Sequence, residues 1–328
     1  MHGVKKLDAV VVGGGMSGVS AARRLKEAGL LVRVVDKGVS LGGRMATRRV
    51  AGGLADHGAQ FITVRSDEFQ SLVDRLYSVG QIKIWHFGWE RERDGFPRYV
   101  GTKGMNSLLR SVGDGLDFTT GFRASSVKVM KDGSYKVFSD DGRSFSADTV
   151  LVTTPLPQAL QIVSDLDTAS LDELSVAYHS TVAVIAPNFT GKLPNGLGAV
   201  KFTDFDKVAI VVDNAQKGIS EVPVLTVHFG HEMSARLFDL EDYEVLEACD
   251  AALATYEISI DTEVAQVKRW RYATPQRLLP SRFLELNVDK ARYPVFFSGD
   301  AFLESRVEGA YLSGYWASAK MIDVLRGR

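Results

Sequence analysis

A glycine-rich turn follows directly after a short apolar run near the start of the chain, in Leu7–Gly18 (LDAVVVGGGMSG). The apolar residues Ala9–Val12 are continuous and β-branched, which is typical of a buried parallel strand. The next segment, Val19–Lys26, has its apolar residues at helical spacing, and Gly29 follows it. The order strand, tight turn, helix predicts the first half of a βαβ unit, and it commits the chain to an α/β fold.

The glycines of this turn fall in G-x-G-x-x-G register. Gly13 permits the sharp turn, Gly15 lets a pyrophosphate approach the backbone, and Gly18 lets the helix pack close to the strand. The helix N-terminus would offer N–H groups and a positive dipole end to phosphates. A second apolar run, Leu31–Val35, ends at Asp36, where an acidic side chain can accept hydrogen bonds from ribose hydroxyls. We therefore predict dinucleotide binding rather than a purely structural βαβ turn.

Composition excludes several classes of protein. The 328 residues carry a formal net charge of −1, which gives no electrostatic footprint for nucleic acid. No apolar run approaches the ~18 residues of a membrane span, and we expect a cytoplasmic protein. Cys249 is the only cysteine, so an intrachain disulfide and a Cys-x-x-Cys redox pair are both impossible. Its place in LEACDAAL predicts a small hydrophobic residue on the buried side of a helix rather than a reactive thiol.

Two further segments are predicted to contact a bound cofactor. In Leu41–Arg49, Gly43 allows close backbone approach, and Arg44 can clamp phosphate oxygens with its forked donors; for Arg48 and Arg49 a solvated basic loop is the alternative. In Asp56–Phe61, small residues flanked by polar ones suit a backbone that runs against a planar ring and presents N–H groups to it.

These motifs resemble one known superfamily. The GGGMSG turn, Gly42–Arg44, Asp56–Phe61 and a C-terminal Ser298–Asp300 together resemble the flavin-containing amine oxidases. Within that superfamily the sequences of Asp56–Phe61 and of Arg269–Ala273 are most similar to those of the renalases, in particular the bacterial ones. The resemblance implies FAD as the cofactor. Because Cys249 lies far in sequence from Gly299 and Gly309, the flavin is expected to be noncovalent.

The resemblance also implies a two-domain α/β flavoprotein of the p-hydroxybenzoate hydroxylase-like type, with a Rossmann-like FAD-binding domain and a mixed α+β substrate domain. We predict residues 1–61, 102–157 and 287–328 for the discontinuous FAD-binding domain, and 62–101 and 158–286 for the substrate domain. Alternation and turn signals predict a β-meander between Ser126 and Val152. No second G-x-G-x-x-G follows a strand in the substrate domain, so a pyridine nucleotide would bind there only as a substrate.

The predicted cofactor contacts follow the same motifs from the N-terminus to the last helix. A helix beginning near Gly309 would point its dipole at the flavin N1 and O2 positions, which become anionic on reduction. Asp300 would hold the ribityl or pyrophosphate region, with a helix cap as the alternative. The full set is Gly13, Gly15, Met16, Ser17, Gly18, Asp36, Lys37, Gly43, Arg44, His57, Gly58, Ala59, Gln60, Phe61, Val127, Gly299, Asp300, Gly309 and Ala310.

The chemistry implied by the resemblance is hydride transfer. Renalases are understood to oxidise 2- and 6-dihydro isomers of NAD(P) and to pass the electrons to O2, giving NAD(P)+ and H2O2. Such a donor becomes aromatic when it loses hydride, so no general base is required, and no catalytic triad, paired-carboxylate or metal-ligand spacing is present. No residue of the chain is therefore assigned a catalytic role, since flavin N5 would carry the reaction. The alternatives are an amine oxidase or desaturase of the same superfamily and a non-catalytic FAD-binding redox sensor.

The walls of the substrate pocket are predicted from composition alone. Arg65 or Arg271 could meet a substrate phosphate, although a solvated face is the simpler interpretation. The pocket residues are expected among Gln60, Trp85, Trp89, His179, Trp270 and Tyr272.

Overall fold

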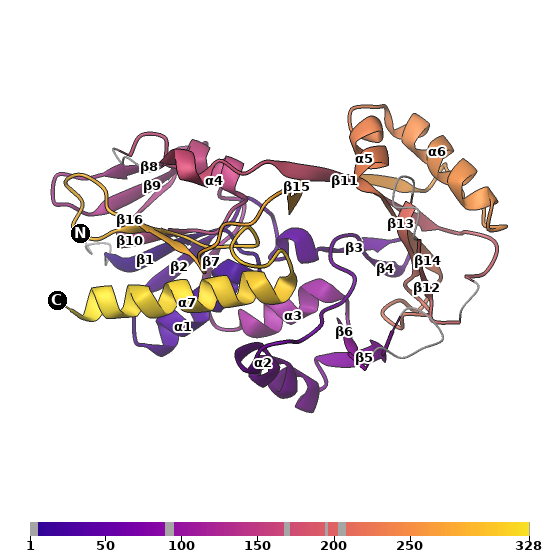
Figure 1. Cartoon of the computed structure of the whole chain (residues 1–328), viewed down its shortest axis with the longest axis horizontal. Coiled ribbons are helices and arrows are strands. Elements are labelled where there is room, and N and C mark those ends of the chain that lie inside the picture. The colour runs from indigo at the N-terminus through magenta and orange to yellow at the C-terminus, as the bar shows by residue number, and fades with distance from the viewer. Residues whose placement is uncertain (1–5, 89–94, 167–170, 194–195, 203–207, 328) are drawn as a thin grey trace. The chain divides into compact units, whose positions relative to one another are not determined.

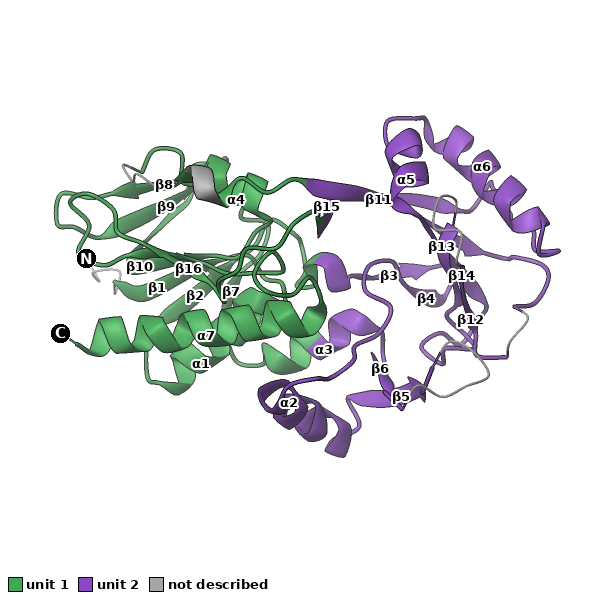
Figure 2. Ribbon diagram, viewed as in Figure 1, with its two compact units in different colours: residues 1–43, 109–177, 275–328 green, residues 44–108, 178–274 purple. Residues whose placement is uncertain are grey.

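The chain folds into two compact units, seen in a computed structural model that describes residues 6–88, 95–166, 171–193, 196–202 and 208–327. Unit 1 comprises residues 1–43, 109–177 and 275–328, and unit 2 comprises residues 44–108 and 178–274 (Figure 2). This grouping differs from the predicted domain boundaries, since residues 44–61 and 102–108 fall in unit 2, and residues 158–177 and 275–286 fall in unit 1. The functional division of the chain stays a prediction.

Unit 1 is built on a largely parallel sheet. Its main path runs β16-β17-β10-β1-β2-β7, and every neighbouring pair is parallel except β16 with β17. The carboxyl ends of β1, β2, β10 and β17 therefore lie at one edge, where dinucleotides bind in such sheets. The strands are β1 Leu7–Val12, β2 Val32–Val35, β7 Asp117–Thr119, β10 Ser144–Val152, β16 Leu284–Leu286 and β17 Val295–Phe297.

Two helices from opposite ends of the chain, α1 Met16–Glu27 and α7 Val307–Arg326, run side by side against this sheet (Figure 1). Leu25 and Met321 are fully buried and pack with the sheet residues in one core. The helices approach so closely that a Cβ on Gly314 would lie 2.1 Å from the carbonyl oxygen of Ser17. This packing brings the C-terminal motif beside the N-terminal one.

The predicted β-meander is confirmed. Strand β8 Ala124–Val129 pairs with β9 Tyr135–Ser139, and β9 pairs antiparallel with the first half of β10. The short helices α3 Met105–Val112 and α4 Leu156–Ile162 flank the meander in sequence. The structure also has two 3-10 helices, η1 Gly43–Met45 and η2 Leu171–Leu174.

Unit 2 is built on a five-stranded sheet of order β12-β13-β14-β11-β15. Helices α5 His231–Leu237 and α6 Asp242–Ala254 cover one face, and Val227 and the single cysteine, Cys249, are buried between sheet and helices. Cys249 is thus a buried hydrophobic residue, as predicted, and burial raises the pKa of its thiol. The strands are β11 Tyr178–Pro187, β12 Ala199–Lys201, β13 Val208–Asp213, β14 Val224–Phe229 and β15 Gln266–Pro275.

The other face of this sheet carries a hairpin, β3 Thr47–Val50 with β4 Gly53–Asp56. Val50 and Ala55 pack there against Ile185 and Val224. Because side chains alternate along β14, His228 shares this face with Val224 while Val227 faces the helices. The hairpin therefore places the segment that follows Asp56 close to His228.

The rest of unit 2 consists of a second hairpin, β5 Ile82–His86 with β6 Arg98–Gly101, and helix α2 Asp67–Ser78. The Oγ of Ser66 accepts a hydrogen bond from Phe69 N at 3.4 Å, which makes Ser66 the N-cap of α2. Helix α5 was not predicted from the sequence. Within the described part of the chain, no helix is long and apolar enough to cross a membrane.

Candidate functional site

The glycine turn in unit 1 has the backbone geometry that the sequence predicts. Gly13 adopts φ +117°, in the region that favours glycine, and a Cβ on Gly18 would lie 2.0 Å from the carbonyl oxygen of Gly13. A Cβ on Gly15, in contrast, would meet no heavy atom within 4 Å. Gly15 is also the N-cap of α1, and no side chain caps the helix there. Met16 and Ser17 form its first turn, so this helix end can donate backbone N–H groups to an anion.

Asp36 closes the turn from the end of β2. One carboxylate oxygen accepts a hydrogen bond from Gly14 N and the other from Gly38 N, both at 2.6 Å. These bonds fix the orientation of the carboxylate, and each oxygen keeps a lone pair that can accept a further hydrogen bond. Lys37 follows in the loop and is exposed.

The ends of β10 and β17 adjoin the same turn. Thr153 donates its hydroxyl hydrogen to the carbonyl of Val12 or Gly13, at 3.0 and 3.1 Å. The next residue, Thr154, has a buried Oγ1 with no hydrogen-bond partner among the described residues. At the end of β17, the hydroxyls of Ser298 and Ser17 lie 2.7 Å apart. A hydrogen-bonding group is therefore left unused at the carboxyl edge of the sheet.

The remaining predicted residues of unit 1 lie on neighbouring elements. Gly299 donates its N–H to the Ser313 hydroxyl at 3.0 Å, and the Asp300 side chain is 8% exposed. Gly309 and Ala310 are in the first turn of α7, where a Cβ on Gly309 would lie 2.1 Å from the Glu304 carbonyl oxygen. Val127 is buried on β8, paired with Val137 of β9.

In unit 2, the segment after Asp56 is held by Arg44 and Trp270. The carbonyl of Arg44 accepts a hydrogen bond from Ala59 N at 2.8 Å, and a Cβ on Gly58 would lie 2.0 Å from that oxygen. The Arg44 guanidinium donates to the carbonyls of Tyr272 and Ala273 on β15, at 3.3 and 3.1 Å. The sequence predicted a phosphate clamp at Arg44, and the structure shows these two carbonyls as partners of its Nη1.

His57 stacks on Trp270 with ring centroids 5.4 Å apart and an interplanar angle of 18°, and the indole N–H donates to the His57 carbonyl at 3.0 Å. Its ring is 9% exposed, and the Nδ1 atom has no hydrogen-bond partner among the described residues. Burial, followed by the charge of Lys268, lowers the pKa of His57 to about 4. His57 is thus neutral at pH 7 and has a ring nitrogen available to a bound molecule.

Gln60 lies in a buried polar network that includes a fully buried lysine. Its side-chain nitrogen donates to the carbonyls of Asp56 and Gly58, at 2.7 and 3.1 Å, and lies 3.3 Å from Nε2 of His228. Its side-chain oxygen accepts a hydrogen bond from Lys217 Nζ at 3.1 Å. Burial lowers the pKa of His228 to about 4.

A cavity of about 250 Å³ opens beside this network within unit 2. His228 and His231 contribute polar groups to its wall, and His179, one of the predicted pocket residues, stacks on His231 with ring centroids 4.3 Å apart. Burial and the neighbouring His179 lower the pKa of His231. The lining residues are Thr181, Ala209, Ile210, His228, Phe229, Gly230 and His231.

The other predicted pocket residues occupy separate places in unit 2. Trp85 donates its indole N–H to the Leu197 carbonyl at 2.8 Å, and its ring centroid is 5.2 Å from Lys217 Nζ. Tyr272 packs edge-on against Tyr178, with ring centroids 5.9 Å apart. Trp89 lies outside the described residues. The Arg271 guanidinium lies over the Phe238 ring on the helix-covered side of β15, whereas Arg65 is exposed.

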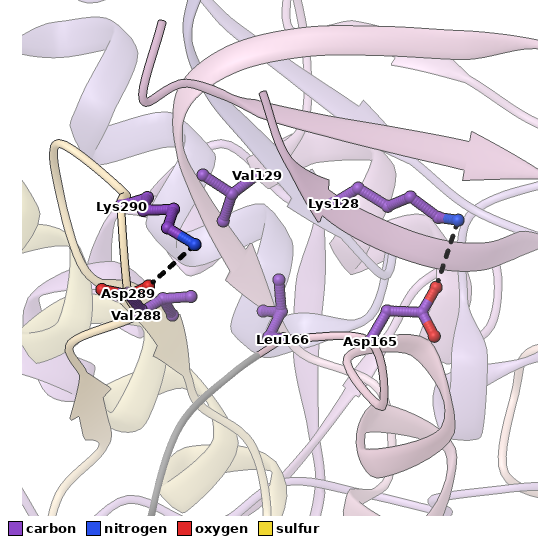
Figure 3. Close-up of a pocket in the computed structure, with 7 residues that line it drawn as sticks. All are labelled: Lys128, Val129, Asp165, Leu166, Val288, Asp289 and Lys290. Carbon is purple, nitrogen blue, oxygen red and sulfur yellow. Dashed lines mark ion pairs between the residues drawn. The ribbon is translucent and has the colours of Figure 1, made fainter. Parts of the chain in front are cut away.

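A second, larger cavity of about 520 Å³ lies in unit 1 and contains none of the predicted site residues (Figure 3). Lys128 pairs with Asp165 and Lys290 with Asp289, each at 3.3 Å, and all four side chains are more than half exposed. Since each lysine is already neutralised, this cavity offers no uncompensated charge to a ligand.

Comparison with known proteins decides the family. Residues 78–322, well over half of the chain, match the family of flavin-containing amine oxidoreductases, and residues 11–76 match an NAD(P)-binding Rossmann-like domain. The chain belongs to the flavin-containing amine oxidoreductases. FAD is its cofactor, as the sequence predicts.

Similarities to individual proteins support the predicted resemblance and the predicted fold. Renalase of Mus musculus is 24% identical over 331 residues, which is 93% of this chain and 95% of the mouse protein. Among solved structures, a "Putative protoporphyrinogen oxidase" from Exiguobacterium sp. 255-15 is similar with a TM-score of 0.72 at 14% identity, covering 99% of this chain and 100% of that one. Cyclohexylamine oxidase from Brevibacterium oxydans IH-35A gives 0.68 at 16% identity, covering 98% and 100%. The two-part Rossmann-like flavoprotein fold and the renalase-like character are thus confirmed.

The residues present fit FAD. The uncapped N-terminus of α1 suits the pyrophosphate, and the unused Thr154 hydroxyl lies at the edge where the dinucleotide is expected. In unit 2 the unpartnered His57 Nδ1 lies in the segment predicted to meet the flavin ring. Cys249 is on the side of α6 that packs into the core of unit 2, so a thioether from the single cysteine to the flavin is excluded.

Sequence reasoning missed three residues, namely Thr154, Lys217 and His228. Thr154 comes two residues after the predicted strand end at Val152, and this position could have indicated a residue at the carboxyl edge of the sheet. Lys217 lies in the polar stretch DNAQKG and His228 in an apolar strand. In neither case does the local sequence indicate a partner, since Gln60 is more than 150 residues away from each.

Proposed function

We propose that this flavoprotein oxidises 2- and 6-dihydro isomers of NAD(P) and passes the electrons to O2. The observation that carries the proposal is the similarity to renalase along 93% of the chain. Amine oxidation is the alternative, and the family match and the cyclohexylamine oxidase fold favour it. A non-catalytic FAD-binding redox sensor is less favoured, because a cofactor turn and a separate cavity are both present.

We further propose which residues hold FAD. The pyrophosphate would bind at the glycine turn and the start of α1, the ribose at Asp36, and the adenine at the backbone of Val127. The flavin ring would lie against the segment after Asp56. The residues assigned to these contacts are Gly13, Gly15, Met16, Ser17, Gly18, Asp36, Lys37, Gly43, Arg44, His57, Gly58, Ala59, Gln60, Phe61, Val127, Gly299, Asp300, Gly309 and Ala310.

When bound, FAD supplies a hydride acceptor at N5. The task of the protein is then to orient the donor without removing a proton from it, because a dihydronicotinamide becomes aromatic by losing hydride alone. His57 and His228 suit this task, since each has a pKa of about 4 and is a weak base at pH 7. Overall, one dihydroNAD(P), one O2 and one proton would give one NAD(P)+ and one H2O2.

The cavity beside His228 is the proposed place for the nicotinamide ring. Its described lining contains no carboxylate that could pair with an ammonium group. A neutral ring with a carboxamide is a better match to apolar walls and imidazole nitrogens. Trp270 and Tyr272, which share one face of β15, and Trp85 remain proposed pocket residues, together with Gln60, His179 and Trp89.

The test is anaerobic stopped-flow of the purified holoprotein, followed in the visible absorption band of the flavin. The donors are 4-dihydroNADH, a mixture of the 2- and 6-dihydro isomers, and a panel of amines. Rapid bleaching by the isomer mixture alone supports the proposal. Bleaching by amines instead would contradict the substrate assignment, and no bleaching by any donor would favour the sensor. The cytoplasmic location expected from the sequence stays a prediction.

A further inference from the structure

Lys217 is a charged residue with no access to solvent. Its side chain is 0% exposed, and its backbone is fixed in a turn where Lys217 N donates to the Asp213 carbonyl at 2.9 Å. The Asp213 carboxylate in turn accepts the N–H groups of Ala215 and Gln216, at 2.9 and 3.3 Å. The turn therefore holds the lysine in place independently of any ligand.

The charge of Lys217 is compensated by a buried carboxylate. Its Nζ lies 2.8 Å from Asp56 Oδ2, while Asp56 Oδ1 accepts hydrogen bonds from Met105 N at 2.8 Å and Thr47 Oγ1 at 2.5 Å. A buried ion pair of this kind contributes little to stability compared with apolar packing. Its presence is better explained by the second hydrogen bond of Lys217, the one to Gln60.

That second bond fixes which way the Gln60 amide points. The side-chain nitrogen faces the carbonyls of Asp56 and Gly58, and the oxygen faces Lys217. Turning the amide over would place its oxygen against two carbonyl oxygens and its NH2 group against an ammonium. The two carbonyls on the nitrogen side and Lys217 on the oxygen side both require the orientation in which the Gln60 nitrogen faces His228.

The amide orientation in turn selects the tautomer of His228. An amide nitrogen cannot accept a hydrogen bond, so the facing Nε2 of His228, 3.3 Å away, must be the unprotonated nitrogen of the ring. The proton of neutral His228 is then on Nδ1, which has no hydrogen-bond partner in the described part of the chain. His228 also lines the 250 Å³ cavity, so an N–H donor is available at its wall.

We infer that Gln60, oriented by the Asp56 and Gly58 carbonyls together with Lys217, is a positioning residue that holds His228 as the Nδ1–H tautomer and so gives the cavity a hydrogen-bond donor for a neutral acceptor on the substrate. If the proposed function holds, that acceptor is the carboxamide oxygen of the dihydronicotinamide. The tautomer itself does not depend on which substrate is oxidised.

Long-range proton–nitrogen NMR of holoprotein labelled with 15N-histidine tests the inference at neutral pH. The His228 signals are assigned from their loss in His228→Asn. Wild type is expected to show the Nδ1–H pattern alone, and Gln60→Leu is expected to show both tautomers, since no amide nitrogen then faces Nε2 of His228. The matched control is Lys83→Met, because Lys83 bonds the Gly218 carbonyl in the adjacent turn at 2.7 Å and has no bond to Gln60. A folded Gln60→Leu that keeps a single Nδ1–H tautomer overturns the inference.

Gln60→Leu removes one hydrogen bond of the fully buried Lys217, which can prevent folding. In that case the same spectrum is recorded for Gln60→Glu, whose carboxylate can still accept from Lys217 and presents an acceptor to Nε2 of His228. A change to the Nε2–H pattern supports the inference, and an unchanged Nδ1–H pattern overturns it. With an active enzyme, KM for the dihydronicotinamide is expected to rise about tenfold in Gln60→Leu with kcat little changed. If no dihydronicotinamide is oxidised, the proposed function fails and the tautomer is still measured.

Discussion

At the scale of single residues, the described part of the site is built from neutral imidazoles. His57 stacks on Trp270, whose indole N–H also donates to the His57 carbonyl, and His228 is held by Gln60. Burial is the largest cause of the lowered pKa in both residues. The charged groups nearby, Asp56 and Lys217, neutralise each other and leave the imidazoles uncharged at neutral pH.

Because His57 is buried, we predict that the free energy of unfolding decreases at acidic pH. Its pKa is about 4 in the folded protein and 6.5 for a histidine exposed to solvent, so the unfolded chain binds more protons between these values. The free energy of unfolding should therefore fall as pH is lowered from 6.5 to 4, by about 3 kcal/mol from this residue. Urea denaturation of wild type and His57→Asn at several pH values checks the contribution. Equal slopes against pH in the two proteins would show that His57 does not titrate in this way.

At the scale of elements, the glycine turn separates two roles that the sequence motif combines. A Cβ on Gly18 would strike the Gly13 carbonyl oxygen at 2.0 Å, whereas a Cβ on Gly15 would enter open space. Gly18 is therefore required by packing, and Gly15 is available for the approach of a ligand.

Substitution of these two glycines should give opposite results. Gly15→Ala should change the free energy of unfolding of the FAD-free protein by less than about 1 kcal/mol, because nothing is displaced. It should weaken FAD binding at least about tenfold, since the new methyl group projects where the pyrophosphate is proposed to lie. Gly18→Ala should destabilise the FAD-free protein by about 1–3 kcal/mol. Flavin titration and denaturant unfolding measure both effects. A Gly15→Ala protein that binds FAD as wild type does would remove Gly15 from the proposed site.

The elements predicted well are those specified by local sequence. The unit from Leu7 to Val35 was predicted because apolar runs, glycines and a terminal acid all lie within about 30 residues. The helix at Asp67–Ser78 is likewise specified locally, by its N-cap Ser66 and by apolar residues at helical spacing. Helix α5 was missed because His231–Leu237 is short and has few apolar residues at helical spacing.

The residues that sequence could not supply depend on contacts between distant segments. Lys217 meets Asp56 across 161 positions of the chain, and in isolation a lysine in a polar turn is typical of a solvated loop. His228 looks like one member of an apolar strand until the hairpin of β3 and β4 brings Gln60 to it. The buried network thus follows from the order of the strands in the sheet, which local patterns do not specify.

At the scale of the whole molecule, each unit has its own apolar core. In unit 1 the core joins α1 and α7 to the parallel sheet, and in unit 2 it joins α6 to the five-stranded sheet. Each unit is assembled from segments far apart in the sequence, because the chain passes from one to the other several times. Separate cores of this kind can open separately when one of them is weakened.

Two substitutions should therefore raise hydrogen exchange in different units. Asp56→Ala leaves the fully buried Lys217 unpaired and should destabilise unit 2 by about 3–5 kcal/mol, exposing amides of β11 and β14 first. Gly314→Ala places a methyl group 2.1 Å from the Ser17 carbonyl oxygen and should act on β1 and β10 of unit 1, by about 1–3 kcal/mol. Exchange measured by mass spectrometry on the FAD-free protein checks both, and each variant serves as the control for the other. If either variant raised exchange equally in both units, the two cores would unfold as one cooperative structure.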